Sequence, residues 1–254
     1  PPLFMGFIKG VPFFWTLRLL PMWAVMVGGV LLMFYLYDGY QYRKEENRDL
    51  IRDRRRVVPL HMTGTINFLW IAGIIAGMFL PFPRREGAFI LVAVLSLLTT
   101  KRQCRTDNRF NYNPILEVAI LFAGIFVTMI PALLILNARG AALGIASPWQ
   151  FFWMTGSLSS FLDNTPTYLA FFSMAQGLGL NGDVMGVPTV FLKAISAGAV
   201  FMGANSYIGN GPNFMVKVIS EEYKLKMPSF FGYMAYSFAL LIPLYVVVTL
   251  LFFR

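Results

Sequence analysis

The sequence predicts an all-α polytopic membrane protein, on the basis of its composition and the length of its apolar stretches. Of its 254 residues, 57% are hydrophobic and only 13% are charged, and the mean hydropathy is +0.63. An ordinary soluble domain carries about 25% charged residues. A membrane-spanning helix needs roughly 20 apolar residues. Most of the long uncharged stretches have that length: 19–37, 62–83, 118–138, 140–162, 164–182, 194–216 and 227–253.

The positive charge of the chain is concentrated in segments between these stretches. A formal net charge of +9 could indicate nucleic-acid binding, but seven Lys/Arg residues fall within 38–60 and four within 101–113. Such segments are typical of cytoplasmic loops that face anionic lipid headgroups. We therefore expect an integral protein of the bacterial inner membrane whose basic loops 38–61 and 101–113 are cytoplasmic, with the lipid bilayer and no nucleic acid as a partner.

The residues that most enzymes use are scarce. The chain has one cysteine, Cys104, and one histidine, His61. A single cysteine cannot build a disulfide framework, and the pair provides neither a His/Cys metal cluster nor a nucleophile with its base. The sequence therefore predicts a protein that is not an enzyme and that needs no cofactor.

The elements follow in order along the chain. Residues 1–37 comprise the end of a helix, an interfacial turn at Pro12 and a first span over 19–37. Because the chain begins with Pro1-Pro2 and no initiator methionine, we expect the C-terminal portion of a longer protein. After the basic loop 38–61 the expected elements are spans at about 62–81, 86–100 and 115–137, a re-entrant hairpin at 148–177, a broken helix at 188–222 and a last span at 229–253.

The hairpin is expected because a single helix does not suit residues 148–177. Such a helix would be about 45 Å long, and the tetrapeptide Asp163-Asn164-Thr165-Pro166 would interrupt it. Lipid offers no partner to a carboxylate or to a broken helix, so this tip must lie in protein or in a water-filled cavity. A hairpin also places the segments 38–60, 101–113 and 221–226, with 13 Lys/Arg residues together, on one side of the membrane.

A second interruption lies at residues 203–213, which contain three glycines, one proline and three asparagines. Gly costs about 1 and Pro about 3 kcal/mol relative to Ala inside a helix. An unwound segment would free backbone carbonyls for cations, and the following half-helix would present N–H groups to anions. A simple Gly/Pro kink is the alternative, but a kink does not need the additional Asn and Ser side chains.

The start of the chain resembles the second break. Pro2-Leu3-Phe4-Met5 aligns with Pro212-Asn213-Phe214-Met215, and the expected topology places the two segments on opposite sides of the membrane. Two breaks of one type indicate an inverted repeat. The chain would then hold the end of the first repeat in 1–37 and the second repeat in 62–254.

The two motifs SSFLDNTPTYLAFF (159–172) and GANSYIGNGPNFMVK (203–217) resemble the ion-transporter superfamily. Within it, the chain is most similar to bacterial proteins named citrate transporters or sodium:proton antiporters, and the similarity covers nearly the whole chain. The resemblance implies an inverted-repeat secondary transporter, with a re-entrant hairpin and a discontinuous helix in each repeat, that forms a homodimer. Sodium-coupled dicarboxylate carriers carry Ser-Asn-Thr at the hairpin tip, where this chain has Asp163 in place of the serine.

Asp163 is the one carboxylate expected deep in the membrane. Removal from water favours its neutral form and a bound Na⁺ its charged form, so one site could hold either Na⁺ or H⁺. A helix cap is a simpler role for Asp163 and is compatible with this one. The expected ion- or substrate-binding residues are Asp163, Asn164, Thr165, Pro166, Thr167, Asn205, Ser206, Gly209, Asn210, Gly211 and Asn213, with Asp163, Asn164 and Asn210 as candidate Na⁺ ligands.

These residues favour sodium/proton antiport by alternating access, in which Na⁺ and H⁺ are the coupling or transported ions. The alternative is cation-coupled transport of citrate or another carboxylate, which Asp163 alone would repel and which Lys193 and Lys217 beside the break could assist. A structural membrane subunit without transport activity is the alternative of another class, although it would not need two polar breaks. We also expect that the site needs the missing first repeat for function.

Overall fold

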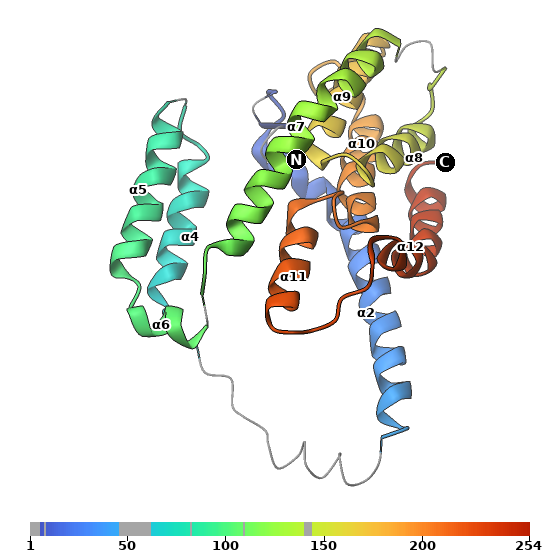
Figure 1. Cartoon of the computed structure of the whole chain (residues 1–254). Coiled ribbons are helices and arrows are strands. Elements are labelled where there is room, and N and C mark those ends of the chain that lie inside the picture. Colours follow the sequence, from blue (N-terminus) through green and yellow to red (C-terminus); the bar gives the residue numbers. More distant parts are fainter. Residues whose placement is uncertain (1–5, 8, 46–61, 82, 109, 140–143) are drawn as a thin grey trace. The chain divides into compact units, whose positions relative to one another are not determined.

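The computed structural model describes residues 6–7, 9–45, 62–81, 83–108, 110–139 and 144–254, and over these ranges the chain is built from helices (Figure 1). It divides into two compact units, Pro1–Tyr40 with Asn113–Arg254, and Gln41–Tyr112. The expected repeat at Pro2–Met5, most of the loop 38–61 and His61 lie outside the described residues.

The first unit begins with a 3₁₀ helix, η1 (Phe13–Leu19), that continues into α2 (Leu20–Tyr42). The helix therefore extends five residues beyond the expected span 19–37. Within the described part of the chain, Phe13–Tyr42 and α12 (Phe230–Phe252) are long and apolar enough to cross a membrane. Large apolar side chains along both helices are exposed, as lipid-facing side chains are. The two helices meet at Gly29, where a Cβ atom would lie 2.5 Å from the Leu244 side chain.

The remaining helices of this unit are α7 (Asn113–Arg139), α8 (Pro148–Ser159), α9 (Asn164–Gly177), α10 (Thr189–Met202) and α11 (Gly211–Glu222). Local sequence accounts for several of their starts. Gln150 Oε1 accepts the backbone N–H groups of Ala146 and Ser147, and Pro148 occupies the first position of α8, where no N–H is needed. Ser229 caps α12 by accepting the Gly232 N–H at 3.2 Å.

Helices α8 and α10 share the most extensive contact between two described helices of the unit, and α9 packs against both. Small residues allow the approach: a Cβ atom on Gly198 would lie 2.4 Å from the Phe152 carbonyl oxygen, and one on Gly156 would lie 2.1 Å from Met202 Sδ. Buried aromatic rings surround this contact, among them Phe151, Phe152, Phe171, Tyr245 and Phe253. The closely packed pair holds the loops at the ends of α8 and α10.

The second unit holds α4 (Ile66–Gly77), α5 (Arg84–Thr99) and a short helix, α6 (Arg102–Asp107). Helices α4 and α5 pack together, and Asn67 Oδ1 accepts hydrogen bonds from Ser96 Oγ at 3.0 Å and Thr100 Oγ1 at 2.8 Å. The segment 101–113 was expected to be a loop, and its charged residues gave no apolar periodicity from which to predict α6.

Candidate functional site

The tip between α8 and α9 is a short turn closed by a helix cap. Asp163 precedes α9 and its Oδ2 accepts the Thr165 N–H at 3.0 Å, while Thr167 Oγ1 donates to the Asp163 carbonyl oxygen at 3.0 Å. Pro166 lies in the first turn, where a missing N–H costs nothing. Among the described residues Asp163 is the one carboxylate that is buried, with 8% of its surface exposed. The cap expected for Asp163 is therefore present, and it uses one of the two carboxylate oxygens.

The break between α10 and α11 is an unwound segment that starts with a single 3₁₀ turn, η3 (Gly203–Asn205). Ser206 and Asn210 have extended backbones, and α11 then starts at Gly211 with Asn210 as its cap. The cap bond runs from the Asn213 N–H to Asn210 Oδ1 over 2.9 Å. The Gly/Pro/Asn composition thus gives a real interruption and not a kink in a continuous helix.

The tip of the α8–α9 hairpin packs directly on this break. Ser160 lies at the centre of the contact: its Oγ donates to the Met202 carbonyl oxygen at 3.0 Å and accepts from Asn205 Nδ2 at 2.9 Å. Its own carbonyl oxygen accepts a hydrogen bond from Ser206 Oγ at 2.5 Å. Ser159 Oγ adds a bond to the Ala199 carbonyl oxygen at 2.7 Å. Two segments about 45 residues apart in the chain therefore share one buried polar network.

Asn164 is the second link between the tip and the break. One side of its side-chain amide faces only hydrogen-bond acceptors, so the nitrogen belongs on that side, and Nδ2 then lies 2.8 Å from both the Gly209 and the Ala199 carbonyl oxygens. Space for the amide depends on Gly203, where a Cβ atom would lie 2.1 Å from it. A Cβ atom on Gly209 would lie 2.5 Å from the Gly203 carbonyl oxygen. The glycines of the break are therefore needed for close approach to the tip.

Helix α12 holds the other side of the break. Tyr245 OH lies within hydrogen-bonding distance of the Phe201 carbonyl oxygen (2.9 Å) and of Asn205 Oδ1 (3.0 Å). Ser237 Oγ donates to the Asn205 carbonyl oxygen at 2.6 Å. With the bond from its Nδ2 to Ser160, Asn205 is fixed by two neighbouring elements at once.

The start of α11 has its own aromatic support. Asn213 Nδ2 donates to the Ser206 carbonyl oxygen at 3.1 Å, and Tyr233 OH donates to the Ala204 carbonyl oxygen at 3.0 Å. The Tyr233 ring stacks on Tyr207 with 4.2 Å between ring centroids.

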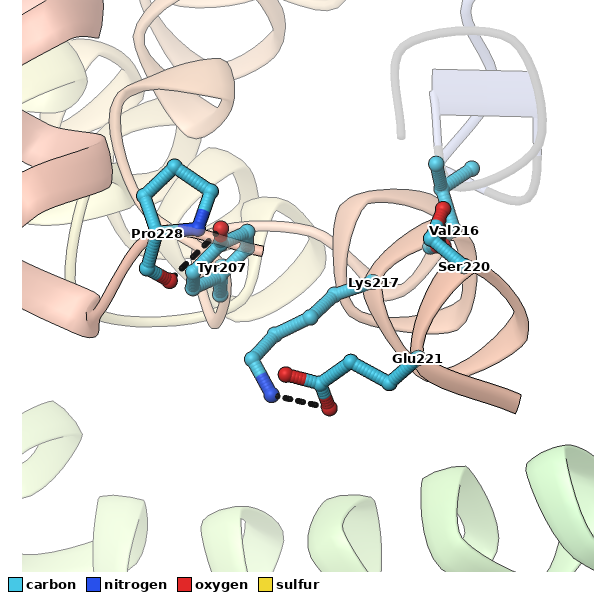
Figure 2. Close-up of polar contacts among 6 residues, drawn as sticks. All are labelled: Tyr207, Val216, Lys217, Ser220, Glu221 and Pro228. Atoms are coloured by element: carbon cyan, nitrogen blue, oxygen red, sulfur yellow. Dashed lines mark hydrogen bonds and ion pairs between the residues drawn. The ribbon is translucent and has the colours of Figure 1, made fainter. Parts of the chain in front are cut away.

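Tyr207 of the break lies beside Lys217 of α11 (Figure 2). Tyr207 OH donates to the Pro228 carbonyl oxygen at 3.1 Å, and Lys217 Nζ lies 5.7 Å from the centroid of the Tyr207 ring. Lys217 Nζ forms an ion pair with Glu221 Oε2 at 2.7 Å, one turn along α11 (Figure 2). The charge of Lys217 is thus compensated within its own helix.

The structure brings together several of the sequence-predicted site residues. Asn164 contacts Gly209, and Asn205 and Ser206 contact the residues just before the tip. Two predicted residues have local roles instead, because the oxygens of Asp163 and Asn210 cap the helices that follow them. The other predicted residues lie in the first turns of the helices at the two breaks: Thr165, Pro166, Thr167, Gly211 and Asn213.

Some residues of the network had not been predicted. Ser159 and Ser160 could have been found, because two hydroxyls stand next to the polar tip in an otherwise apolar run. Ser237 and Tyr245 belong to an uncharged helix and carried no local signal. Among the described residues, no three His, Cys, Asp or Glu side chains gather as a metal cluster would require. Neutral oxygens around one carboxylate are what this region offers to an ion.

The chain matches a known protein family. The model of a protein family described as "Putative citrate transport" matches residues 1–253. No curated protein and no solved structure matches the chain.

Proposed function

The chain belongs to the family described as "Putative citrate transport", and on this premise we propose how it couples transport to an ion. The family makes it an integral membrane transporter and not an enzyme. We propose a secondary transporter that works by alternating access and exchanges Na⁺ or a similar cation for H⁺, with Asp163 as the shared binding group. Inverted repeats, a re-entrant hairpin, a homodimer and an inner-membrane location with basic loops in the cytoplasm are parts of the same proposal.

The burial of Asp163 is the observation that carries this proposal. A carboxylate that exposes only 8% of its surface, and that has no Lys or Arg in an ion pair with it among the described residues, is a group to which a proton or a metal cation can bind. Its Oδ2 accepts one N–H bond, while Oδ1 accepts none from the described residues. One carboxylate oxygen is therefore available to bind either ion.

Neutral oxygens near the tip would complete the coordination of Na⁺. Hard cations prefer oxygen ligands, and backbone carbonyls freed by unwound helices provide them. The carbonyls of Ala199 and Gly209 now face Asn164 Nδ2. Reorientation of this one amide would turn its oxygen toward an ion and release the two carbonyls. Asn164 is thus the residue through which ion binding at the tip would change the contact with the break.

Cation-coupled transport of citrate is the second candidate, and the family match favours it. Helices α9 and α11 both begin in this region, and the N-terminus of a helix attracts a carboxylate. Lys217 is paired with Glu221 and is a poor partner for a second anion. In this version a cation at Asp163 would balance part of the negative charge of citrate.

Ion flux in proteoliposomes tests both candidates. The full-length protein would be reconstituted with a trapped pH dye, and Na⁺, Li⁺ and citrate would be added separately and together. We expect Na⁺ or Li⁺ alone to drive proton movement, and Asp163→Asn to abolish it. Asp183→Asn is the matched control, because Asp183 is an exposed carboxylate in the turn before α10.

Antiport, carboxylate transport and a structural role predict different results in this experiment. If protons moved only when Na⁺ and citrate were both present, the result would favour cation-coupled carboxylate transport over antiport. Full cation-driven flux in the Asp163→Asn protein would refute the role of Asp163 in either version. A protein without any flux would support the structural-subunit alternative.

A further inference from the structure

We propose that the corner between α5 and α6 binds the phosphate headgroup of an anionic phospholipid. This corner borders a cavity of about 800 Å³ that lies wholly in the second unit. Three cationic side chains line it, Lys101, Arg102 and Arg105, together with threonine, leucine and aromatic residues. The proposal concerns a lipid site, so it goes beyond the proposed function and does not depend on which ion or cargo is transported.

The geometry of the corner gathers the three cations. Helix α5 ends at Thr99, the backbone is extended at Thr100, and α6 starts at Arg102. Arg105 Nη2 donates back to the Leu97 carbonyl oxygen, which ties α6 to the last turn of α5. Lys101 lies in the connection, and Arg102 is the first residue of α6. The fold thus places three positive charges around one opening.

Among the described residues that line this cavity there is no negative side chain to compensate these charges. Within the described part of the chain, none of the three cations takes part in an ion pair. Asp107 is the acidic residue of α6, and it lines a neighbouring pocket that Lys101 also borders. Lysine and arginine donors around an open pocket are the usual way in which proteins hold phosphate.

The threonines of the cavity do not offer free donors. Thr99 Oγ1 donates to the Leu95 carbonyl oxygen, Thr100 Oγ1 to Asn67 Oδ1, and Thr106 Oγ1 to the Gln103 carbonyl oxygen. The anion would therefore be held by the cationic groups, and binding should depend on them and on ionic strength.

The surroundings favour a lipid phosphate over free phosphate. Leu91, Val94 and Leu98 lie on one face of α5 that leads to the cavity, and Leu98 is 77% exposed. Leu98 itself lines the cavity, as do Phe110 and Tyr112, whose rings meet edge to face at 5.1 Å. Aromatic rings of this kind collect at the level of lipid headgroups. A phospholipid could pack an acyl chain against the apolar face of α5 and place its phosphate among the cationic groups of the cavity.

Lipid titration of the full chain in a neutral detergent tests the proposal. Phosphatidylglycerol, phosphatidylcholine and inorganic phosphate would be added separately, and native mass spectrometry would count the bound molecules while thermal unfolding reports stabilisation. We expect tight binding of phosphatidylglycerol alone. The double variant Lys101→Gln/Arg102→Gln should bind it about 30-fold more weakly, since each basic residue near a membrane surface contributes about fivefold.

Two further variants serve as controls for the total charge of the protein and for the charge at the site. Lys224→Gln/Lys226→Gln removes two exposed cations elsewhere and should bind phosphatidylglycerol as the wild type does. Lys101→Arg/Arg102→Lys keeps the charge and should restore binding. Equal losses in both Gln double variants, or equal binding of phosphatidylcholine, would overturn the site. Binding of inorganic phosphate as tight as that of phosphatidylglycerol would assign the cavity to free anions and overturn the lipid reading.

Discussion

Replacement of Gly198 by alanine should separate α8 from α10 and loosen the hairpin from the break. A Cβ atom at Gly198 would lie 2.4 Å from the Phe152 carbonyl oxygen and 3.3 Å from the Gly156 nitrogen. Both neighbours are backbone atoms inside α8, so no side chain can rotate away. An ordinary contact of about 3.4 Å then requires the helices to separate by roughly 1 Å.

The magnitude follows from the contacts that this movement would break. Ser159 Oγ and the Ala199 carbonyl oxygen are 2.7 Å apart, and a separation larger by about 1 Å exceeds hydrogen-bonding distance. Overpacking costs about 1–3 kcal/mol, and one or two lost hydrogen bonds cost about 1 kcal/mol each. Alanine returns about 1 kcal/mol of helix propensity. The free energy of unfolding should therefore fall by roughly 1–4 kcal/mol.

Thermal unfolding in detergent, together with flux in proteoliposomes, measures this effect. Gly28→Ala is the matched control, because Gly28 lies in α2 and a Cβ atom there would meet no other atom within 4 Å. We expect the control to be at least as stable as the wild type, because alanine gains about 1 kcal/mol of helix propensity there without a clash, and we expect Gly198→Ala to be less stable and slower in transport. If Gly198→Ala were as stable and as active as Gly28→Ala, the close contact of α8 and α10 would not hold the site together.

Two further substitutions test the network itself. Asn164→Leu keeps the branched shape of the side chain but leaves the Gly209 carbonyl without its donor, so the free energy of unfolding should fall by about 1–3 kcal/mol; unchanged stability in a denaturation experiment would contradict this. Tyr245→Phe removes the hydroxyl beside Asn205 and should cost about 1 kcal/mol, whereas Tyr236→Phe, at an exposed position of the same helix, should be neutral; equal unfolding temperatures for the two variants would refute the assignment.

The sequence predicted the positions of the helices better than their contacts. The interruptions at 163–166 and 203–213 were visible because Asp, Pro, Gly and Asn are costly within a helix. The placement of α8–α9 at 148–177 and of α12 at 229–253 followed from runs of apolar residues. The short helix α6 could not be predicted in this way, because its six residues are mostly charged or polar.

The hydrogen-bond partners of individual side chains could not be predicted from the sequence, for a different reason. Periodicity and composition identify elements, but a hydrogen bond between residues 40 or more positions apart depends on how those elements pack. Tyr245 illustrates this: it lies in a uniformly apolar helix, and its contact with Asn205 exists only because α12 passes the break. The sequence likewise predicted Asn210 as an ion ligand, whereas its amide oxygen caps α11. Whether it also binds an ion stays a prediction.

The helix cap formed by Asp163 is relevant to how ion binding could be coupled to a conformational change. Asp163 and Asn164 are adjacent, yet one bonds within its own hairpin and the other bonds to the break. A change of charge at Asp163 would alter the start of α9, on which Asn164 lies, and thus the position of its amide against Gly209. A ligand can shift an equilibrium between two conformations only through contacts that differ between them. In the proposed transporter, the contact of Asn164 with the break is the one that would differ between the proton-bound and cation-bound states.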